Sequence, residues 1–327
     1  MKKNIAIIMG GYSSEYLISL KSGNMVFDSL PKASYNAYCI HILKDKWVYV
    51  SEDLLEYPVN KADFSIVISG SKINFDCVFN AIHGSPGEDG TIQAYFELLS
   101  IPHTSCDMYQ AALTFNKRDC LSALKPYGVL TADSYFLNVG DPIDPSAIEN
   151  AVGFPCFVKA NKSGSSFGIT KVYSKAELPN AIETAFKEDN ELIIESFLEG
   201  TEVSVGVIRY KGEVKVLPIT EIVTDNDFFD YEAKYLGKSK EITPARLSTT
   251  QEAEVRKVAK YIYEVLKLDG FSRSEFIFKD DKPHLIEINT IPGLTKESIL
   301  PQQAAQAGIS LAELFENAIH EALEKNS

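Results

Sequence analysis

Apolar runs of strand length alternate with helical patterns through the first third of the chain. The run 4–9 is followed by Gly10-Gly11 and by a helical pattern over about 14–30. Strand, glycine turn and helix in this order are typical of the opening of a parallel α/β unit. We therefore expect an N-terminal α/β domain over residues 1–104. Further elements predicted within it are strands at 37–41, 47–50 and 76–81 and a helix at 91–99.

Beyond residue 105 the pattern changes to mixed helices and strands. The patterns predict an α/β fold that is α+β in its central and C-terminal parts, with domains at 105–197 and 198–327. The central domain is expected to contain helices at about 108–125 and 175–186 and strands at 134–137, 156–160, 169–172 and 192–196. The last domain is expected to contain strands at 202–209 and 214–219, an irregular stretch at 224–246, and helices at 250–266 and about 310–325.

A polar turn near the C-terminus joins two apolar runs and predicts a β-hairpin. If the turn is symmetric about Asp281, Glu275 lies opposite Glu287 and Arg273 lies opposite Asn289. Because side chains alternate along a strand, all four charged or polar side chains then lie on one face. The other face is apolar and fixes the register, since a slip by one residue would bury the charges. It consists of Phe276, Phe278, Ile286 and Ile288.

This hairpin has the composition of a metal site. Two carboxylates about 5 Å apart across a strand pair repel by about 3 kcal/mol at an effective dielectric constant of about 20. A divalent cation between the oxygens, helped by the amide oxygen of Asn289, would turn that repulsion into ligation. Oxygen ligands without a nearby His or Cys suit Mg²⁺ better than zinc. The hairpin alone leaves a second interpretation open, in which Arg273 neutralises two surface acids.

Composition narrows the class of protein. The chain has 327 residues, of which 45% are hydrophobic and 24% charged, as in soluble globular proteins of two or three domains. No apolar run approaches the roughly 18 residues of a membrane span. The net charge of −13 disfavours nucleic acid or an anionic membrane as a partner. Five scattered cysteines without a C-x-x-C pair are typical of reduced thiols, so we expect a cytosolic protein.

Several loops lie where ligands are often bound. The glycine-rich loop 162–168 follows a strand that ends with Lys159 and can fold over a polyphosphate, although the Walker order is absent. The loop 80–90 carries His83 between a strand and a helix, and Pro292-Gly293 exposes a backbone N–H beside the hairpin. Each of these loops, taken alone, is also compatible with an ordinary turn. The aromatic-rich stretch 224–246 is expected to be a binding loop.

The order of the motifs is more informative than any one of them. Along the chain they are GG-x-S-x-E, H-G-x-x-G-E-D-G, V-K followed by G-S-S-x-G, D-Y-x-x-K-Y, R-x-E and E-x-N-x-x-P-G-x-T. From Gly10 to the final helix they closely resemble the D-alanine–D-alanine ligases of the ATP-grasp superfamily. The resemblance implies three domains, with ATP bound between the central and C-terminal ones. It also implies that ATP activates the first D-alanine as an acyl phosphate, which the second D-alanine's amine attacks, for peptidoglycan precursor synthesis.

Carried over residue by residue, the resemblance implies four sets of site residues. Those implied to bind ATP are Lys117, Lys159, Ser165, Ser166, Glu195, Ser196, Phe197, Leu198, Glu202 and Lys234. Those implied to bind the two D-alanines are Glu15, His83, Arg273, Gly293, Ser298 and Ile299. The implied catalytic residues are Glu15, Ser165, Tyr235, Arg273 and Ser298. The implied ligands of two Mg²⁺ ions, with Mn²⁺ as a substitute, are Glu275, Glu287 and Asn289.

Some residues depart from the usual family pattern, and some alternatives stay open. Ser163, Ser196 and Glu275 stand where an acid, a lysine and an aspartate are frequent, but no required group is lost. Tyr235 favours a dipeptide product. The alternatives are a D-alanyl-D-serine or D-alanyl-D-lactate ligase, another carboxylate–amine ligase, and a non-catalytic ATP-binding protein. The resemblance also implies a homodimer and closure of the loops 162–168 and 224–246 over the site.

Overall fold

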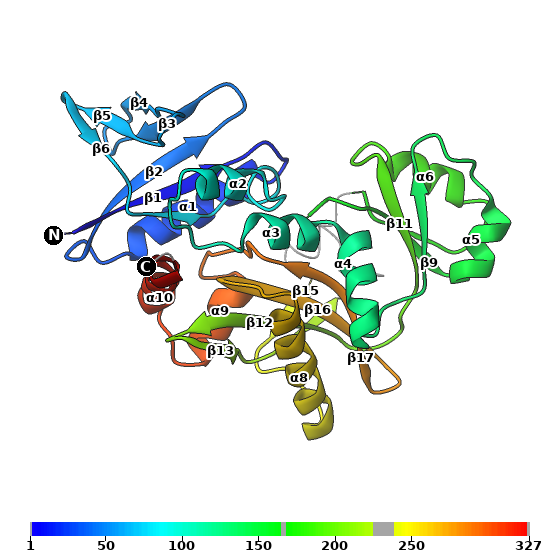
Figure 1. Cartoon of the computed structure of the whole chain (residues 1–327). Helices are drawn as coiled ribbons and strands as arrows, with labels where there is room; N and C mark the ends of the chain where they lie inside the picture. The colour runs from blue at the N-terminus through cyan, green and yellow to red at the C-terminus, as the bar shows by residue number, and fades with distance from the viewer. Residues whose placement is uncertain (1, 165–167, 225–238, 326–327) are drawn as a thin grey trace.

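The computed structural model describes residues 2–164, 168–224 and 239–325 and folds them into three units. Figure 1 shows the N-terminal and central units at opposite ends of the molecule, with the C-terminal sheet between them. Within the described residues, no helix is both long and apolar enough to cross a membrane. All five cysteines are free thiols.

The N-terminal unit is built on a five-stranded sheet of order β4-β3-β2-β1-β7. Strand β1 (Lys3–Gly10), which lies between β2 and β7, is buried from residue 5 onward and pairs in parallel with both neighbours. It is buried on both faces because α1 and α10 pack on one side and α2 on the other. The elements are α1 (Tyr16–Ser29), β2 (Tyr35–Ile42), β3 (Trp47–Val50), β4 (Glu56–Pro58), β5 (Ile66–Ile68), β6 (Ser71–Ile73), β7 (Cys77–Asn80) and α2 (Thr91–Leu98).

The closing helix α10 (Leu311–Lys325) completes the N-terminal core. Its Leu314, Phe315 and Ile319 are buried against Phe79 of β7 and the α1 face of the sheet. Figure 1 accordingly shows the C-terminus close to the N-terminal unit. The last helix of the chain therefore joins the first unit to the last.

Two helices occupy the stretch for which one helix is predicted. α3 (Met108–Phe115) and α4 (Lys117–Leu124) are separated by Asn116, which has φ −89° and ψ 98°. The Asn116 side chain accepts a hydrogen bond from the Asp119 amide and so caps α4. The single-helix prediction was wrong because no glycine or proline marks the break. The break makes Lys117 the first residue of α4, which is followed by the 3₁₀ turn η1 (Lys125–Tyr127).

The central unit is a four-stranded antiparallel sheet of order β10-β9-β11-β8 with two helices on one face. The helix α5 was not predicted, although Asp144 caps it and Pro145 opens it. The other face of the sheet carries Lys159 and Glu195 toward the C-terminal unit. The elements are β8 (Ser134–Asn138), α5 (Pro145–Val152), β9 (Cys156–Ala160), β10 (Thr170–Val172), α6 (Leu178–Ala185) and β11 (Glu191–Ser196).

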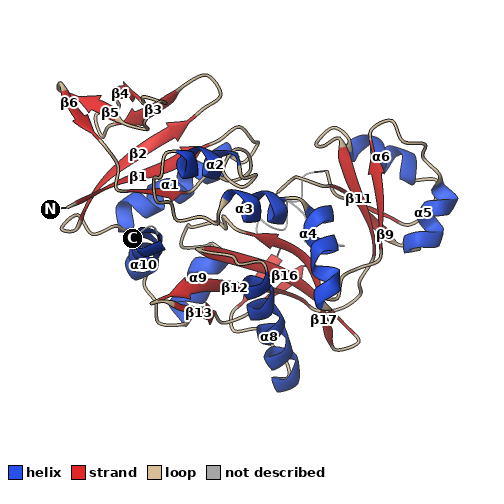
Figure 2. Cartoon of the chain, in the orientation of Figure 1, coloured by secondary structure: helices blue, strands red, loops and turns tan. Residues whose placement is uncertain are grey.

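The C-terminal unit is a six-stranded sheet of order β15-β14-β12-β16-β17, with β13 paired to β12. Helix α8 packs on the apolar face of the sheet, and Figure 2 shows the helix against the sheet. Helix α9 lies on the opposite face, where Nε2 of Gln303 donates hydrogen bonds to Ser204 O and Thr220 Oγ1. The elements are β12 (Glu202–Tyr210), β13 (Glu213–Val216), β14 (Thr220–Thr224), β15 (Ser239–Ile242), α8 (Thr249–Val265), β16 (Phe271–Lys279), β17 (Lys282–Asn289) and α9 (Ile299–Gln306).

The stretch 224–246 is not irregular throughout. β15 pairs with β14 and gives this part of the chain backbone hydrogen bonds, so the prediction was wrong for residues 239–242. Residues 225–238 lie outside the described residues. The predicted strand 214–219 is shorter than expected, because β13 ends at Val216 and the next strand, β14, begins only at Thr220; both strands pair with β12.

The predicted hairpin is present, but the centre of its turn differs from the prediction. Glu275 pairs with Glu287 and Arg273 with Asn289, as predicted. The turn is not symmetric about Asp281, because Asp280 and Asp281 form a two-residue turn with φ of 50° and 60°. Such left-handed values are those of a type I′ hairpin turn. A β-bulge after Glu275 shifts the register by one residue and so produces the predicted charged pairs.

The bulge also changes one predicted apolar position. Phe276, Phe278 and Ile288 are buried with α8 as predicted, but the fourth buried side chain is Leu285, not Ile286. Ile286 is the extra residue at the bulge, and it turns toward the charged face and lines a cavity between the central and C-terminal sheets.

Separate alanine substitutions of Leu285 and Ile286 test this arrangement. Leu285→Ala removes a side chain that is 0% exposed and should lower the free energy of unfolding by about 2–5 kcal/mol. Ile286→Ala should lower it by no more than about 1 kcal/mol, because Ile286 is only half-buried. Urea denaturation measures both values. A larger loss for Ile286→Ala than for Leu285→Ala would contradict the bulge.

Candidate active site

A cavity of about 450 Å³ lies between the central and C-terminal sheets. Its walls combine apolar side chains such as Phe157, Ile277 and Ile286 with lysines and acids. This mixture suits a ligand that has an aromatic base at one end and phosphates at the other. The cavity brings together the predicted ATP-binding residues Lys117, Lys159, Glu195, Ser196, Phe197, Leu198 and Glu202, and it reaches Glu275 and Glu287.

Lys159 and Glu195 form a buried ion pair in the wall of this cavity. The Nζ of Lys159 lies 2.7 Å from Oε2 of Glu195, and the two side chains are only 10% and 2% exposed. Burial alone would lower the pKa of Lys159, but the Glu195 carboxylate outweighs it and raises the pKa above its ordinary value. Lys159 therefore stays charged, which its predicted role in binding phosphate requires.

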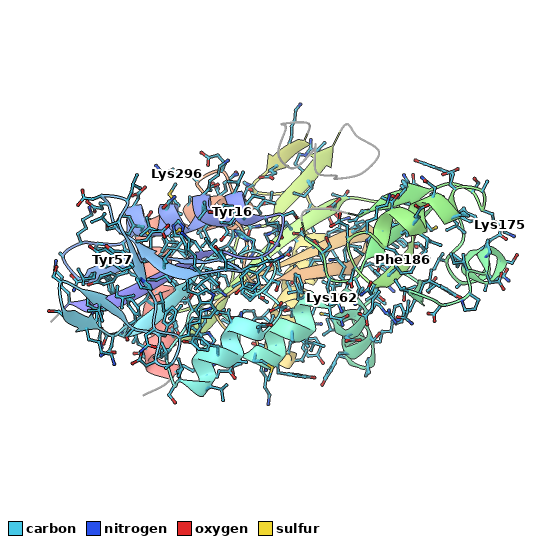
Figure 3. All side chains as sticks on the ribbon, turned by 90° about the horizontal axis from the view of Figure 1, so that it is seen from above. Tyr16, Tyr57, Lys162, Lys175, Phe186 and Lys296 are labelled. Carbon is cyan, nitrogen blue, oxygen red and sulfur yellow. The ribbon has the colours of Figure 1, made fainter. Side chains whose placement is uncertain are left out.

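Lys117 connects the glycine-rich loop to the hairpin. Its ammonium donates a hydrogen bond to Ser163 O at 2.7 Å and lies 3.2 Å from Oε2 of Glu287. The start of the loop is held against α4 because Asn161 accepts a hydrogen bond from the Arg118 amide and donates one to Asn116. Viewed from above in Figure 3, the labelled Lys162 lies near the middle of the molecule, far from Lys175 at its outer end.

The segment 195–198 is held by its own side chains. Ser196 accepts a hydrogen bond from the Asp133 amide at 3.2 Å, and its own amide donates to Asp133 O at 2.9 Å. The Phe197 ring has the Lys171 ammonium 4.0 Å from its centroid and Phe157 beside it at 6.1 Å. The serine that departs from the family pattern therefore fixes the backbone of this segment.

A second cavity, of about 90 Å³, shares Glu287 with the first. It lies at the junction of the N-terminal and C-terminal units and collects the predicted substrate residues Glu15, His83, Arg273 and Gly293. The glycine-rich loop reaches this cavity as well, because a Cβ on Gly164 would lie 2.7 Å from Oε2 of Glu15. The two cavities thus meet at the hairpin and the loop.

Both ring nitrogens of His83 are bonded to the protein. Nδ1 lies 2.9 Å from Ile291 O, so it donates, and Nε2 lies 2.9 Å from Oγ of Ser22, so it accepts. The same Ser22 oxygen accepts a hydrogen bond from the Leu294 amide at 3.3 Å. Burial lowers the pKa of His83, although Glu15 acts in the opposite direction. His83 is therefore a neutral residue that fixes the loop 291–294 against α1.

The predicted metal ligands fit a divalent cation by their chemistry and position. Glu275 and Glu287 lie opposite each other, and Asn289 follows on the same face of β17. Glu275 lies beside the guanidinium of Arg273, and Glu287 beside the ammonium of Lys117. Two carboxylates and an amide oxygen, with no sulfur or imidazole among them, are the ligands that Mg²⁺ prefers.

Two of the remaining predicted residues, Ser298 and Ile299, lie at the edge of this arrangement. Ser298 opens α9, and its Oγ lies 3.0 Å from Oγ1 of Thr295 and close to Gly293, where a Cβ would be 2.7 Å away. Ile299 is buried directly behind it. Ser165, Ser166, Lys234 and Tyr235 lie outside the described residues.

The sequence interpretation missed one buried acid of the site. Glu88 is 7% exposed, lines the smaller cavity and accepts a hydrogen bond from the Gly84 amide at 2.7 Å. Burial, helped by the nearby Glu15, raises its pKa to about 8. Its position within the glycine-rich motif 83–90 was the available signal, because that motif already contains the predicted substrate residue His83.

The fold and the site define an ATP-grasp enzyme. Comparison with known proteins shows to which family of these enzymes the chain belongs. The family models described as D-ala D-ala ligase N-terminus and C-terminus match residues 4–106 and 123–320. A D-alanine–D-alanine ligase of Flavobacterium johnsoniae is 68% identical over 317 residues, covering 97% of this chain and 98% of the relative. One from Phocaeicola vulgatus is 42% identical over 320 residues, covering 98% and 99%. The chain belongs to the D-alanine–D-alanine ligase family.

Solved structures confirm the predicted fold. The D-alanine–D-alanine ligase of Bacillus anthracis complexed with ATP has a TM-score of 0.81 at 29% identity, covering 99% of this chain and 98% of that one. The VanG D-Ala:D-Ser ligase of Enterococcus faecalis has a TM-score of 0.86 at 31% identity, covering 98% and 100%. The three-part ATP-grasp architecture predicted from the motifs is therefore correct.

The pKa of Glu88 predicts how stability depends on pH. Its value rises from 4.5 to about 8 on folding, so the folded state binds an extra proton between these pH values. The contribution of Glu88 to the free energy of unfolding is fully present below about pH 4.5 and is lost as the pH rises toward 8. Relative to Glu88→Gln, the native protein should lose at least about 1 kcal/mol of unfolding free energy between pH 5 and pH 8. Denaturation at both pH values checks this, and a parallel pH dependence of the two proteins would refute it.

Proposed function

We propose that this chain is an ATP-dependent ligase that joins two D-alanines to D-alanyl-D-alanine, by way of a D-alanyl phosphate, and releases ADP and phosphate. Similarity to ligases over almost the whole chain supports the reaction. The proposed roles of individual residues rest on the position of Glu287, which lines both cavities. A nucleotide in the larger cavity and a small acid in the smaller one would meet at this side chain.

The proposed roles in the first step follow from charge. Lys117 and Lys159 hold the phosphates, the segment 195–198 holds the adenine, and Glu202 holds the ribose. Phosphoryl transfer requires positioning and charge neutralisation more than covalent help. Glu15 receives the ammonium group of the first D-alanine, whose carboxylate attacks the γ-phosphate.

In the second step an amine attacks the acyl carbon and a negative charge develops on its oxygen. Arg273 and the N–H of Gly293 line the smaller cavity and would stabilise that oxyanion. Ser298 and Ile299, at the start of α9, would hold the carboxylate of the second D-alanine. Phosphate then leaves and the peptide bond is complete.

Glu275, Glu287 and Asn289 would hold two Mg²⁺ ions, with Mn²⁺ as a substitute. Such ions, when bound, neutralise the charge of the ATP phosphates. Until then, Arg273 and Lys117 balance the two carboxylates, so the acidic pair does not destabilise the folded chain.

Further parts of the proposal rest on the resemblance. Ser165, Ser166, Lys234 and Tyr235 would act from the loops 162–168 and 224–246, which close to keep water from the acyl phosphate. The domains would be 1–104, 105–197 and 198–327. The enzyme would work as a homodimer in the cytosol, in peptidoglycan precursor synthesis, without nucleic acid or membrane as a partner.

Phosphate release from Mg-ATP, with mass spectrometry of the product, tests the function. We expect release with D-alanine alone and none with L-alanine, and D-alanyl-D-alanine as the product. Release that requires D-serine or D-lactate as a second acid would replace this assignment by one of the other ligases. No release with any of these acids would support a non-catalytic nucleotide-binding protein.

Removing one proposed metal ligand should weaken the binding of Mg²⁺ more than the binding of ATP. Glu287→Gln is expected to raise the Mg²⁺ concentration for half-maximal activity by at least about tenfold. Glu254→Gln, on the exposed face of α8, is the matched control and should leave this concentration unchanged. An unchanged Mg²⁺ requirement in Glu287→Gln would exclude Glu287 as a ligand.

A further inference from the structure

Glu88 is a buried acid of the smaller cavity to which the proposed reaction gives no role. It borders this cavity together with Glu15, the proposed acceptor of the first substrate's ammonium group. Arg273 and Gly293, which in the proposed reaction contact the acyl oxygen, border it as well. An ammonium group is attracted by carboxylates and repelled by a guanidinium. The amino end of a substrate in this cavity therefore faces Glu15 and Glu88.

Gly84 brings these two acids together. Its amide donates a hydrogen bond of 2.7 Å to Oε2 of Glu88. A Cβ on the same glycine would lie 3.4 Å from Oε2 of Glu15. The φ of Gly84 is 69°, a left-handed value that glycine adopts without strain. Both carboxyl groups thus adjoin one residue, and an ammonium group that enters beside Gly84 meets both of them.

The ammonium group needs more acceptors than Glu15 alone. It has three N–H donors. His83, which the resemblance assigns to the substrate, has both ring nitrogens hydrogen-bonded to the protein. A carboxylate has acceptor sites for about four hydrogen bonds. The amides of Gly84 and Ile291 approach the carboxyl of Glu88 and leave part of this capacity for a ligand.

Glu88 also lacks a cation of its own. Among the described residues, no lysine or arginine forms an ion pair with it. Burial and the nearby Glu15 raise its pKa to about 8, and Lys117 acts more weakly in the opposite direction. The carboxyl is therefore kept neutral as long as no cation is beside it. The ammonium group of a substrate would supply that charge, and the displaced proton would pass to the solvent.

We propose that Glu88 is a substrate-binding residue that shares the ammonium group of the first D-amino acid with Glu15. This inference rests on the proposed ligase function. His83 then serves the substrate indirectly, by fixing the loop 291–294. A 2-hydroxy acid has a neutral hydroxyl in place of the ammonium group and gains less from a carboxylate, because a charged donor forms the stronger hydrogen bond. Glu88 therefore favours an amino acid in the first position.

Two substitutions separate the charge of Glu88 from its hydrogen bond to the loop. Glu88→Gln keeps an oxygen that can accept the bond from the Gly84 amide and removes the charge, whereas Glu88→Met removes both. Initial rates of the full-length enzyme with Mg-ATP, fitted to a two-site rate equation, give separate KM values for the first and the second D-alanine. In both variants the KM for the first should rise about tenfold or more, while the KM values for the second and for ATP change by less than about twofold.

Asp89→Asn is the matched control. Asp89 is the next residue of the same loop and is not among the described residues that line the two cavities. Its Oδ1 accepts a hydrogen bond of 3.0 Å from the Thr91 amide, which an asparagine can accept as well. This variant should keep all three KM values of the native enzyme.

Two results would overturn the proposal. A native KM for the first D-alanine in Glu88→Gln, with a raised one in Glu88→Met, would show that the hydrogen bond to Gly84 matters and the charge does not. An equal rise of both D-alanine KM values in Glu88→Gln would show that the loop 80–90 has moved.

The remaining outcomes separate this proposal from the function on which it rests. If native enzyme forms D-alanyl-D-alanine and both Glu88 variants keep the native KM for the first D-alanine, only the role of Glu88 is wrong. If native enzyme forms no dipeptide, the ligase function itself is wrong, and Glu88 loses its proposed substrate with it.

Discussion

Two carboxylates held opposite each other on neighbouring strands are the constraint on which the rest of this ligase depends. Glu275 and Glu287 are paired by the register of β16 and β17, and that register is fixed by the phenylalanines packed beneath them against α8. The repulsion, about 3 kcal/mol at this separation, has to be offset by cations from other parts of the chain. Arg273 supplies one from the same strand. Lys117 supplies the other from α4, and it can do so because the chain breaks at Asn116 and starts a new helix at this point.

The same pair connects the three units of the molecule. Glu287 borders the nucleotide-sized cavity, which the central sheet closes, and the smaller cavity, which the N-terminal unit closes. Lys117 bonds the glycine-rich loop of the central unit, and Gly164 of that loop lies against Glu15 of the N-terminal unit. In the proposed reaction, activation and condensation would both take place around this one acidic side chain, and the reactive acyl phosphate would not need to travel between its formation and its use.

Much of this arrangement follows from the sequence, and the exceptions have physical causes. The charged face of the hairpin was predicted because side-chain alternation leaves few alternatives once Phe276 and Phe278 must be buried. The bulge was not, since Leu285 and Ile286 are both aliphatic and only packing against α8 decides which of them is buried. Asn116 ends one helix and caps the next without a glycine or proline, so periodicity alone predicts one helix. The pairing of β15 and the burial of Glu88 depend on contacts distant in sequence, which no local pattern contains.

The hydrogen-bonded His83 joins residues that are 208 positions apart, from a loop after β7 to Ile291 beyond the hairpin. Ser22 extends the link from α1 to Leu294, and α10 then closes the core around β1. During synthesis on the ribosome, the N-terminal sheet emerges long before these partners exist. The smaller cavity, which is the proposed site of the first amino acid, can therefore form only after Ile291, Leu294 and α10 have been synthesised.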